Sequence, residues 1–70
     1  MDRYCVNRNE QDNGDHEVHN LAANCPFEPA PANQIDLGSH ATCGSAVDAA
    51  KRYYRQSNGC AKCARNCHTG

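Results

Sequence analysis

The chain has 70 residues, six of them cysteine, and a formal net charge of −1 with histidine neutral. This length allows one domain at most, and the charge gives no overall attraction to nucleic acid or to an anionic membrane. With no tryptophan, one phenylalanine and three tyrosines, the apolar interior is too small to hold the domain closed without disulfides, a metal ion or a partner chain.

The N-terminal third is predicted to form a β-hairpin. Residues 4–6 (Tyr-Cys-Val) are β-prone, and residues 17–19 (Glu-Val-His) can pair back as a second strand. The polar segment between them contains the turn dipeptide Asn13-Gly14. We therefore expect two antiparallel strands joined by a wide loop.

The middle of the chain is predicted to be a loop followed by a third strand. Pro26, Pro29 and Pro31 forbid a helix and disfavour a central strand. Residues 34–37 (Gln-Ile-Asp-Leu) then alternate polar and apolar side chains, which is typical of a strand. Residues 38–40 are expected to end it.

One helix is predicted over residues 43–55, with Thr42 as its N-cap. Its apolar side chains recur at helical spacing and give one buried face. Residues 57–59 are expected to stop the helix, with Gly59 in a left-handed conformation. The fold class is therefore a single α+β domain over residues 1–70, with a short antiparallel sheet of about three strands, one helix packed on it, and a flexible tail over 64–70.

The cysteines are expected to bind metal. The chain starts at Met1 and shows no basic segment followed by an apolar stretch, so we expect no secretory signal, no membrane segment and a cytoplasmic location. In that compartment cysteine clusters hold metal more often than they form disulfides. Cys60-x-x-Cys63 after a glycine turn has the spacing with which two thiolates hold one Zn²⁺ ion.

The other two zinc ligands are predicted to be His19 and Cys25. A structural zinc site has four ligands, and ligands from distant segments stabilise a small domain most. His19 ends a predicted strand and Cys25 precedes Pro26, so together they would tie the hairpin to the C-terminal segment.

Alternative ligands stay open at both ends of the chain. His16 competes with His19, although the two would point to opposite faces of a strand. At the other end Cys67 and His68 could replace a proposed ligand, because spacings of two to four residues all occur in zinc sites.

Cys5 and Cys43 are instead predicted to be small apolar core residues. Cys5 lies within a predicted strand and Cys43 opens the apolar face of the helix. Oxidation to a disulfide between them also stays open.

The order of these parts resembles the Ada-type metal-binding fold, in the branch whose first ligand is histidine. The resemblance runs over residues 18–63, through Val18-His19, Asn-x-Ile-x-Leu at 33–37, the short alanine-rich helix and Gly59-Cys60-Ala61-Lys62-Cys63. The His19–Cys25 spacing is longer than is usual in the family. The whole chain also resembles a group of short uncharacterised bacterial proteins rich in cysteine and histidine, which implies no function.

The resemblance implies a structural zinc domain and no enzyme. In the DNA-repair member of this fold, a zinc-bound cysteine at the first ligand position accepts a methyl group. His19 holds that position here, and a neutral imidazole cannot replace the thiolate nucleophile. Four filled ligand positions also leave none for an activated water.

Three functions are therefore considered. The first is a monomeric structural zinc domain that binds a partner macromolecule, either protein or nucleic acid. The second is a nucleic-acid-binding module that uses the basic C-terminal third, with Tyr53 or Tyr54 stacking on bases. The third is a redox sensor in which Cys43 or Cys67 attacks a zinc thiolate on oxidation. The basic residues of the second function are Lys51, Arg52, Arg55, Lys62 and Arg65.

Overall fold

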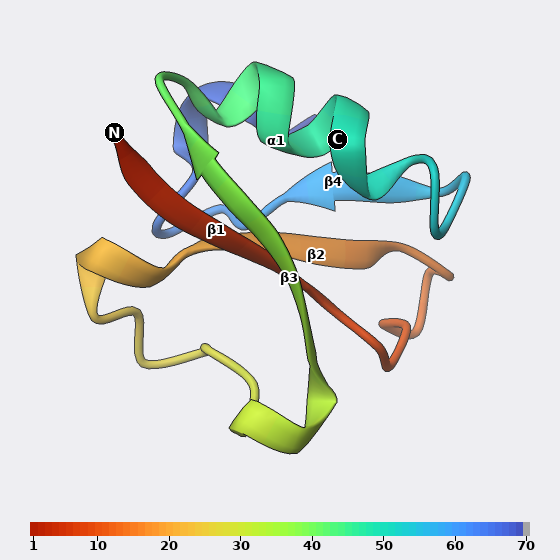
Figure 1. The fold of residues 1–70 in the computed structure, drawn as a ribbon. Helices are drawn as coiled ribbons and strands as arrows, with labels where there is room; N and C mark the ends of the chain where they lie inside the picture. The colour runs from red at the N-terminus through yellow and green to blue at the C-terminus, as the bar shows by residue number, and fades with distance from the viewer. Residues whose placement is uncertain (70) are drawn as a thin grey trace.

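A four-stranded mixed sheet with one helix forms the framework of the domain. The computed structural model describes residues 1–69, and Figure 1 shows the helix above the sheet and the long loop after the second strand on the opposite side. The strands are β1 (Asp2–Asn7), β2 (His16–Asn20), β3 (Gln34–His40) and β4 (Ser57–Gly59), in the spatial order β3-β1-β2-β4. The helix α1 spans Cys43–Ala50, and three short 3₁₀ helices, η1 to η3, span Leu21–Ala23, Pro31–Asn33 and Arg65–Cys67.

The core lies between the sheet and α1, and it is small. Its buried members are Tyr4, Val6, Val18, Ala46, Val47 and Ala50. Because successive strand residues point to opposite faces, Cys5 and His19 lie on the other face of the sheet. These two residues pair directly across β1 and β2. The apolar core thus stabilises only one face of the sheet.

The sheet has one more strand than the sequence predicted, and it is not purely antiparallel. β4 occupies residues 57–59, where a helix stop was expected, and pairs in parallel with β2. Gly59 is not left-handed. Glycine is needed there because an added Cβ would come within 2.8 Å of the Ala64 carbonyl oxygen.

The third strand also extends further than expected. β3 continues to His40, because an irregularity in its pairing with β1 lets the chain pass Gly38 without leaving the sheet. Gly38 has a φ of 80°, a conformation that glycine adopts without strain. Residues 38–40 therefore prolong the strand that they were predicted to end.

The predicted helix over 43–55 is wrong in its length. α1 ends at Ala50, and the next residues form turns. The backbone N–H groups of Tyr53 and Tyr54 both donate to the Ala50 carbonyl, so the chain tightens where the helix was expected to continue. Thr42 occupies the N-cap position as predicted, but its side chain makes no capping hydrogen bond.

The interpretation of Cys43 as a free core thiol is wrong, because Cys43 and Cys67 form a disulfide. Their Cα atoms lie 6.1 Å apart, within the range that a disulfide spans. Cys5 is buried with a free thiol. The pairing left open between Cys5 and Cys43 is therefore absent from the structure over residues 1–69.

The segment predicted as a flexible tail makes defined contacts up to residue 69. Besides the disulfide, the Thr69 N–H donates to Asn58 Oδ1 and the Asn58 side-chain amide donates to the Thr69 carbonyl oxygen. His68 Nδ1 lies 2.9 Å from the Gly59 carbonyl oxygen. Residue 70 lies outside the described residues. Within residues 1–69, no helix is long and apolar enough to cross a membrane.

Candidate metal centre

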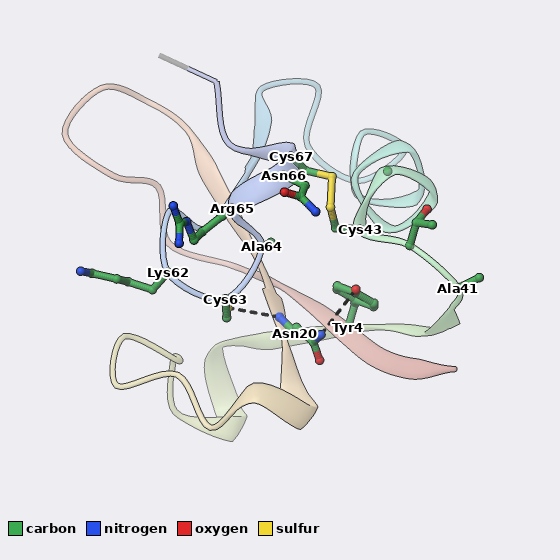
Figure 2. A pocket seen from close by; sticks show the side chains of 12 residues that line it. Tyr4, Asn20, Ala41, Cys43, Lys62, Cys63, Ala64, Arg65, Asn66 and Cys67 are labelled. Atoms are coloured by element: carbon green, nitrogen blue, oxygen red, sulfur yellow. Dashed lines mark hydrogen bonds between the residues drawn. A yellow bond between two sulfur atoms is a disulfide. The ribbon is translucent and has the colours of Figure 1, made fainter.

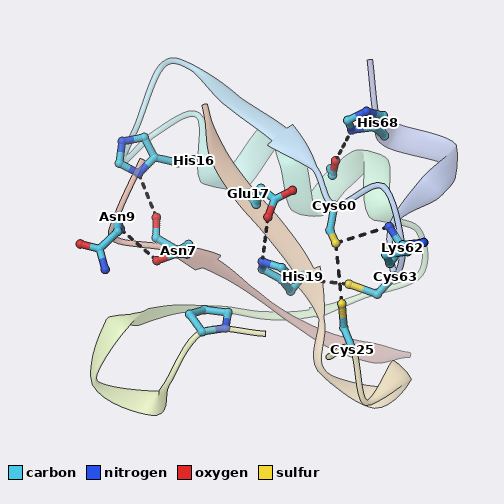
Figure 3. A network of polar contacts seen from close by, with 12 residues as sticks. Asn7, Asn9, His16, Glu17, His19, Cys25, Cys60, Lys62, Cys63 and His68 are labelled. Atoms are coloured by element: carbon cyan, nitrogen blue, oxygen red, sulfur yellow. Dashed lines mark hydrogen bonds and ion pairs between the residues drawn. The ribbon is translucent and has the colours of Figure 1, made fainter. Parts of the chain in front are cut away.

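Four side chains from three separate segments converge beside the sheet. They are His19, Cys25, Cys60 and Cys63, and their potential ligand atoms all lie within 4.8 Å of one another. Figure 3 shows the three sulfur atoms and the imidazole ring turned toward a common point. The structure thus brings together the same four residues that the sequence predicted.

The parallel pairing of β2 and β4 places His19 next to the cysteine pair. Val18 pairs with Gly59, and the Cys60 N–H donates to the Val18 carbonyl oxygen at 2.9 Å. The chain then turns, with the Ala64 N–H donating to the Cys60 carbonyl oxygen. This turn presents both sulfurs of the Cys60-x-x-Cys63 motif beside His19.

Cys25 reaches the cluster through a compact turn after β2. The side chain of Asn20 accepts a hydrogen bond from the Ala22 N–H and caps η1. Asn24 then adopts a left-handed conformation with a φ of 52° and redirects the chain, so that Cys25 faces His19. The long spacing between the first two cluster residues is therefore filled by one 3₁₀ turn and its left-handed end.

The two shortest distances between potential ligand atoms fit a tetrahedral zinc site. Cys25 Sγ lies 3.7 Å from Cys60 Sγ, and Cys63 Sγ lies 3.5 Å from His19 Nδ1. Zinc–sulfur bonds of about 2.3 Å and zinc–nitrogen bonds of about 2.0 Å put two sulfurs about 3.8 Å apart and sulfur and nitrogen about 3.5 Å apart in a tetrahedron. The donor set and its spacing therefore suit a structural metal ion such as zinc.

His19 has the surroundings of a metal ligand. Its ring is fully buried, and burial lowers the pKa of the imidazole, which keeps it neutral as ligation requires. Nδ1 faces the sulfurs, whereas Nε2 has no hydrogen-bond partner within residues 1–69 and lies 3.6 Å from Glu17 Oε1. A carboxylate beside the second ring nitrogen is a common arrangement that orients a zinc-bound histidine.

Cys63 lies where a cation is needed to ionise its thiol. Burial raises the pKa of the Cys63 thiol to about 12, so without a cation it is protonated at neutral pH. Cys63 Sγ also accepts a hydrogen bond from the Asn20 N–H, and Cys60 Sγ accepts one from the Lys62 N–H. Backbone N–H groups directed at sulfur stabilise thiolate character.

Cys5 is a separate case on the same face of the sheet. It is fully buried, and desolvation raises the pKa of its thiol to about 11. It does not belong to the four-residue cluster. Its role as a small apolar residue agrees with the sequence prediction.

The alternative ligands have other partners. His16 stacks on Tyr54, with ring centroids 3.7 Å apart, and its Nδ1 lies 2.9 Å from the Asn7 carbonyl oxygen. His68 contacts Gly59, and Cys67 is in the disulfide. None of these three candidates joins the cluster described within residues 1–69.

An open groove of about 860 Å³ lies beside the metal cluster. Figure 2 shows Tyr4 and Asn20 along one side, the turn with Cys63 and Ala64 along another, and the disulfide close to the groove. Cys63 is half-buried, whereas the other three cluster residues are at most 7% exposed. Of the four cluster residues, Cys63 thus connects the cluster to this groove.

The predicted nucleic-acid-binding residues fall into two groups. Lys62 and Arg65 line the groove at the start of α1, whereas the other three lie in the turns after its end. The eight residues of α1 span about 12 Å and separate the groups. Tyr54 is stacked on His16, while Tyr53 is exposed. The other three basic residues are Lys51, Arg52 and Arg55.

The chain matches no protein-family model, and no curated protein or solved structure is significantly similar to it.

Proposed function

We propose that this protein is a small structural zinc-binding domain. The observation that carries the proposal is the buried cluster of three thiols and one imidazole at tetrahedral spacing. His19, Cys25, Cys60 and Cys63 would hold the ion. Because the ion would join β2, the loop after it and the turn after β4, zinc would supply the cross-link that the small core lacks.

The donor set favours a structural role over a catalytic one. Structural zinc sites have four protein ligands, whereas catalytic zinc sites keep one position for water or substrate. Three cysteines and one histidine fill a tetrahedron. We therefore propose that the protein is not an enzyme.

We further propose that the domain belongs with the Ada-type metal-binding fold in its histidine-first branch. The supporting observation is that His19 and Cys60-x-x-Cys63 occupy one cluster in the order that the resemblance requires. On this proposal the domain is a cytoplasmic monomer that binds a partner macromolecule. Its zinc site would fix the shape of the binding surface without contributing chemistry.

Zinc content and chelation test the zinc proposal together. Native mass spectrometry should show one zinc ion per chain, and removal of zinc by a strong chelator should abolish the folded circular dichroism signal. Alanine substitution of His19 or Cys25 should strongly weaken zinc binding, whereas substitution of His16 should leave it unchanged. A protein that carries no zinc, or that stays fully folded in chelator with its cluster thiols free, would contradict the proposal.

Partner binding needs its own test, with nucleic acid as the first candidate. Titration of the zinc-loaded protein into labelled single-stranded and duplex DNA at two salt concentrations would show whether phosphate contacts contribute. Because the basic residues are split into two groups, we expect weak binding with a small salt dependence. A steep loss of affinity with added salt would favour the nucleic-acid-binding function instead.

A further inference from the structure

The disulfide and the metal cluster share one short stretch of chain. Cys60 and Cys63 lie at the start of this stretch and Cys67 ends it. The disulfide joins Cys67 to Cys43, the first residue of α1. The same turn is therefore fixed to β2 through the cluster and to the helix through the disulfide.

A continuous series of backbone hydrogen bonds connects the two sites. The Cys67 N–H donates to the Ala64 carbonyl oxygen, the Ala64 N–H donates to the Cys60 carbonyl oxygen, and the Cys60 N–H donates to the Val18 carbonyl oxygen. Gly59 packs so closely beneath this turn that an added Cβ would lie 2.9 Å from Cys67 Cβ. A shift of Cys67 therefore has little room to relax before it reaches Cys60.

The two cysteines of the disulfide line the open groove. Cys43 and Cys67 are both half-buried and line the open groove, whose volume of about 860 Å³ is large enough for a tripeptide-sized thiol. Figure 2 shows the bond between the start of α1 and the end of the turn. Cys5, Cys25 and Cys60, by contrast, are buried. A dissolved thiol would thus reach the disulfide more readily than these three cysteines.

We propose that Cys43–Cys67 is a redox-active site for low-molecular-weight thiols, and that its reduction weakens zinc binding by the neighbouring cluster. This inference rests on the proposed zinc site and adds its regulation. In the cytoplasmic location expected from the sequence, a disulfide would be transient, as redox-sensing disulfides are. The cluster cysteines would stay reduced because metal ligation protects them.

The chemical step is a thiol–disulfide exchange. A small-molecule thiolate attacks one sulfur of the disulfide, the bond between Cys43 and Cys67 breaks, and its electron pair leaves on the other sulfur, which takes up a proton. A second thiolate attacks the mixed disulfide and releases the remaining cysteine thiol. The protein gains two electrons and two protons, and two small-molecule thiols become one disulfide.

The coupling between the two sites must be reciprocal. If zinc binds the oxidised protein more tightly than the reduced protein, zinc must make the disulfide harder to reduce by the same factor. We expect a factor of about tenfold or more, within the range of typical coupling between linked sites. Reduction breaks the link between Cys67 and α1. The turn that contains Cys60 and Cys63 is then attached to β2 but no longer to the helix.

The test measures both sides of this linkage on the unmodified chain. Zinc dissociation constants are measured for the oxidised and the reduced protein by competition with a chromophoric chelator. The ratio of reduced to oxidised glutathione at half-reduction of the disulfide is then measured with and without zinc buffered at saturation. We expect tighter zinc binding by the oxidised form and an equal shift in the redox midpoint.

Two controls separate this coupling from general loss of stability. The double substitution C43S/C67S mimics the reduced state and should weaken zinc binding as reduction does. Val47→Ala also destabilises the α1 packing but keeps the disulfide, so at an equal loss of thermal stability it should lose less zinc affinity than C43S/C67S.

Three results are decisive. Equal zinc affinity of both redox forms would overturn the inference and leave the zinc site standing. A reduction rate independent of glutathione concentration would overturn it too, because the bond would then be reached only through unfolding. Failure of both forms to bind zinc would overturn the proposed function itself.

Discussion

Substitution of Cys25 by alanine should separate metal ligation from ordinary packing. Cys25 is the one cluster residue on the long loop after η1, and it is 7% exposed. Its removal leaves the other three ligands on β2 and on the turn after β4. The matched control is Cys5→Ala, which also deletes a buried thiol on the same side of the sheet but from outside the cluster.

The expected magnitude follows from the ligand count. Structural zinc in small domains contributes about 10–16 kcal/mol of apparent binding free energy, so loss of one of four ligands should cost roughly 2.5–4 kcal/mol. This corresponds to a zinc affinity lower by roughly 10²- to 10³-fold for Cys25→Ala. Cys5→Ala should lower thermal stability through the lost packing, but it should lower zinc affinity far less than Cys25→Ala because it keeps all four ligands.

Cobalt substitution supplies the assay. Co²⁺ bound by thiolates has sulfur-to-metal charge-transfer bands whose intensity follows the number of sulfurs, and zinc displaces cobalt in a competition titration. The unmodified protein and Cys5→Ala should both give the spectrum of three thiolates, and Cys25→Ala that of two. If the two variants had equal zinc affinities, or if Cys5→Ala lowered zinc affinity more than Cys25→Ala, the assignment of Cys25 as a ligand would be refuted.

Three further substitutions and one titration extend the test. Gly59→Ala should destabilise the protein by about 1–3 kcal/mol in thermal unfolding, because the new Cβ meets the Ala64 carbonyl oxygen at 2.8 Å. Gly44→Ala is the matched control, because its nearest contact is at 3.6 Å, and it should stabilise α1 by about 0.5–1 kcal/mol. Glu17→Gln should lower zinc affinity by about 10- to 100-fold in chelator competition, because its carboxylate lies 3.6 Å from His19 Nε2; an unchanged affinity would show that this carboxylate does not support the ligand. Zinc binding near pH 7 should release about three protons, one from each cluster thiol and none from the neutral His19, so zinc affinity should fall as pH falls. Calorimetry in buffers of different ionisation enthalpy counts the released protons. A count near one would exclude a three-thiolate site.

The sequence predicted the four cluster residues because two of them form a motif of short, recognisable spacing. Cys60-x-x-Cys63 has a spacing typical of a metal site, and a cross-link needs its other ligands from a distant segment, where His19 and Cys25 lie. The strands around these residues were predicted by alternation and β propensity, and β1, β2 and β3 are confirmed as strands. Their ends differ, because pairing across the sheet extends them beyond the apolar runs.

Two features that the sequence did not predict, β4 and the disulfide, depend on long-range contacts. Ser57-Asn58-Gly59 has the composition of a turn and becomes β4 only because β2 offers a parallel partner. The Cys43–Cys67 pairing could not be deduced from spacing, because six cysteines allow many connectivities. The sequence offers Cys67 as an alternative ligand, and it does not show that the fold brings the start of α1 next to the turn after β4, where Cys43 meets Cys67.

X-ray absorption at the zinc edge of the purified protein would show directly which atoms hold the ion. A site formed by His19, Cys25, Cys60 and Cys63 must give three sulfurs at about 2.3 Å and one nitrogen at about 2.0 Å, with no oxygen in the first coordination sphere. Four sulfurs, a bound water, or the absence of zinc would contradict the claim that this tetrad closes the domain.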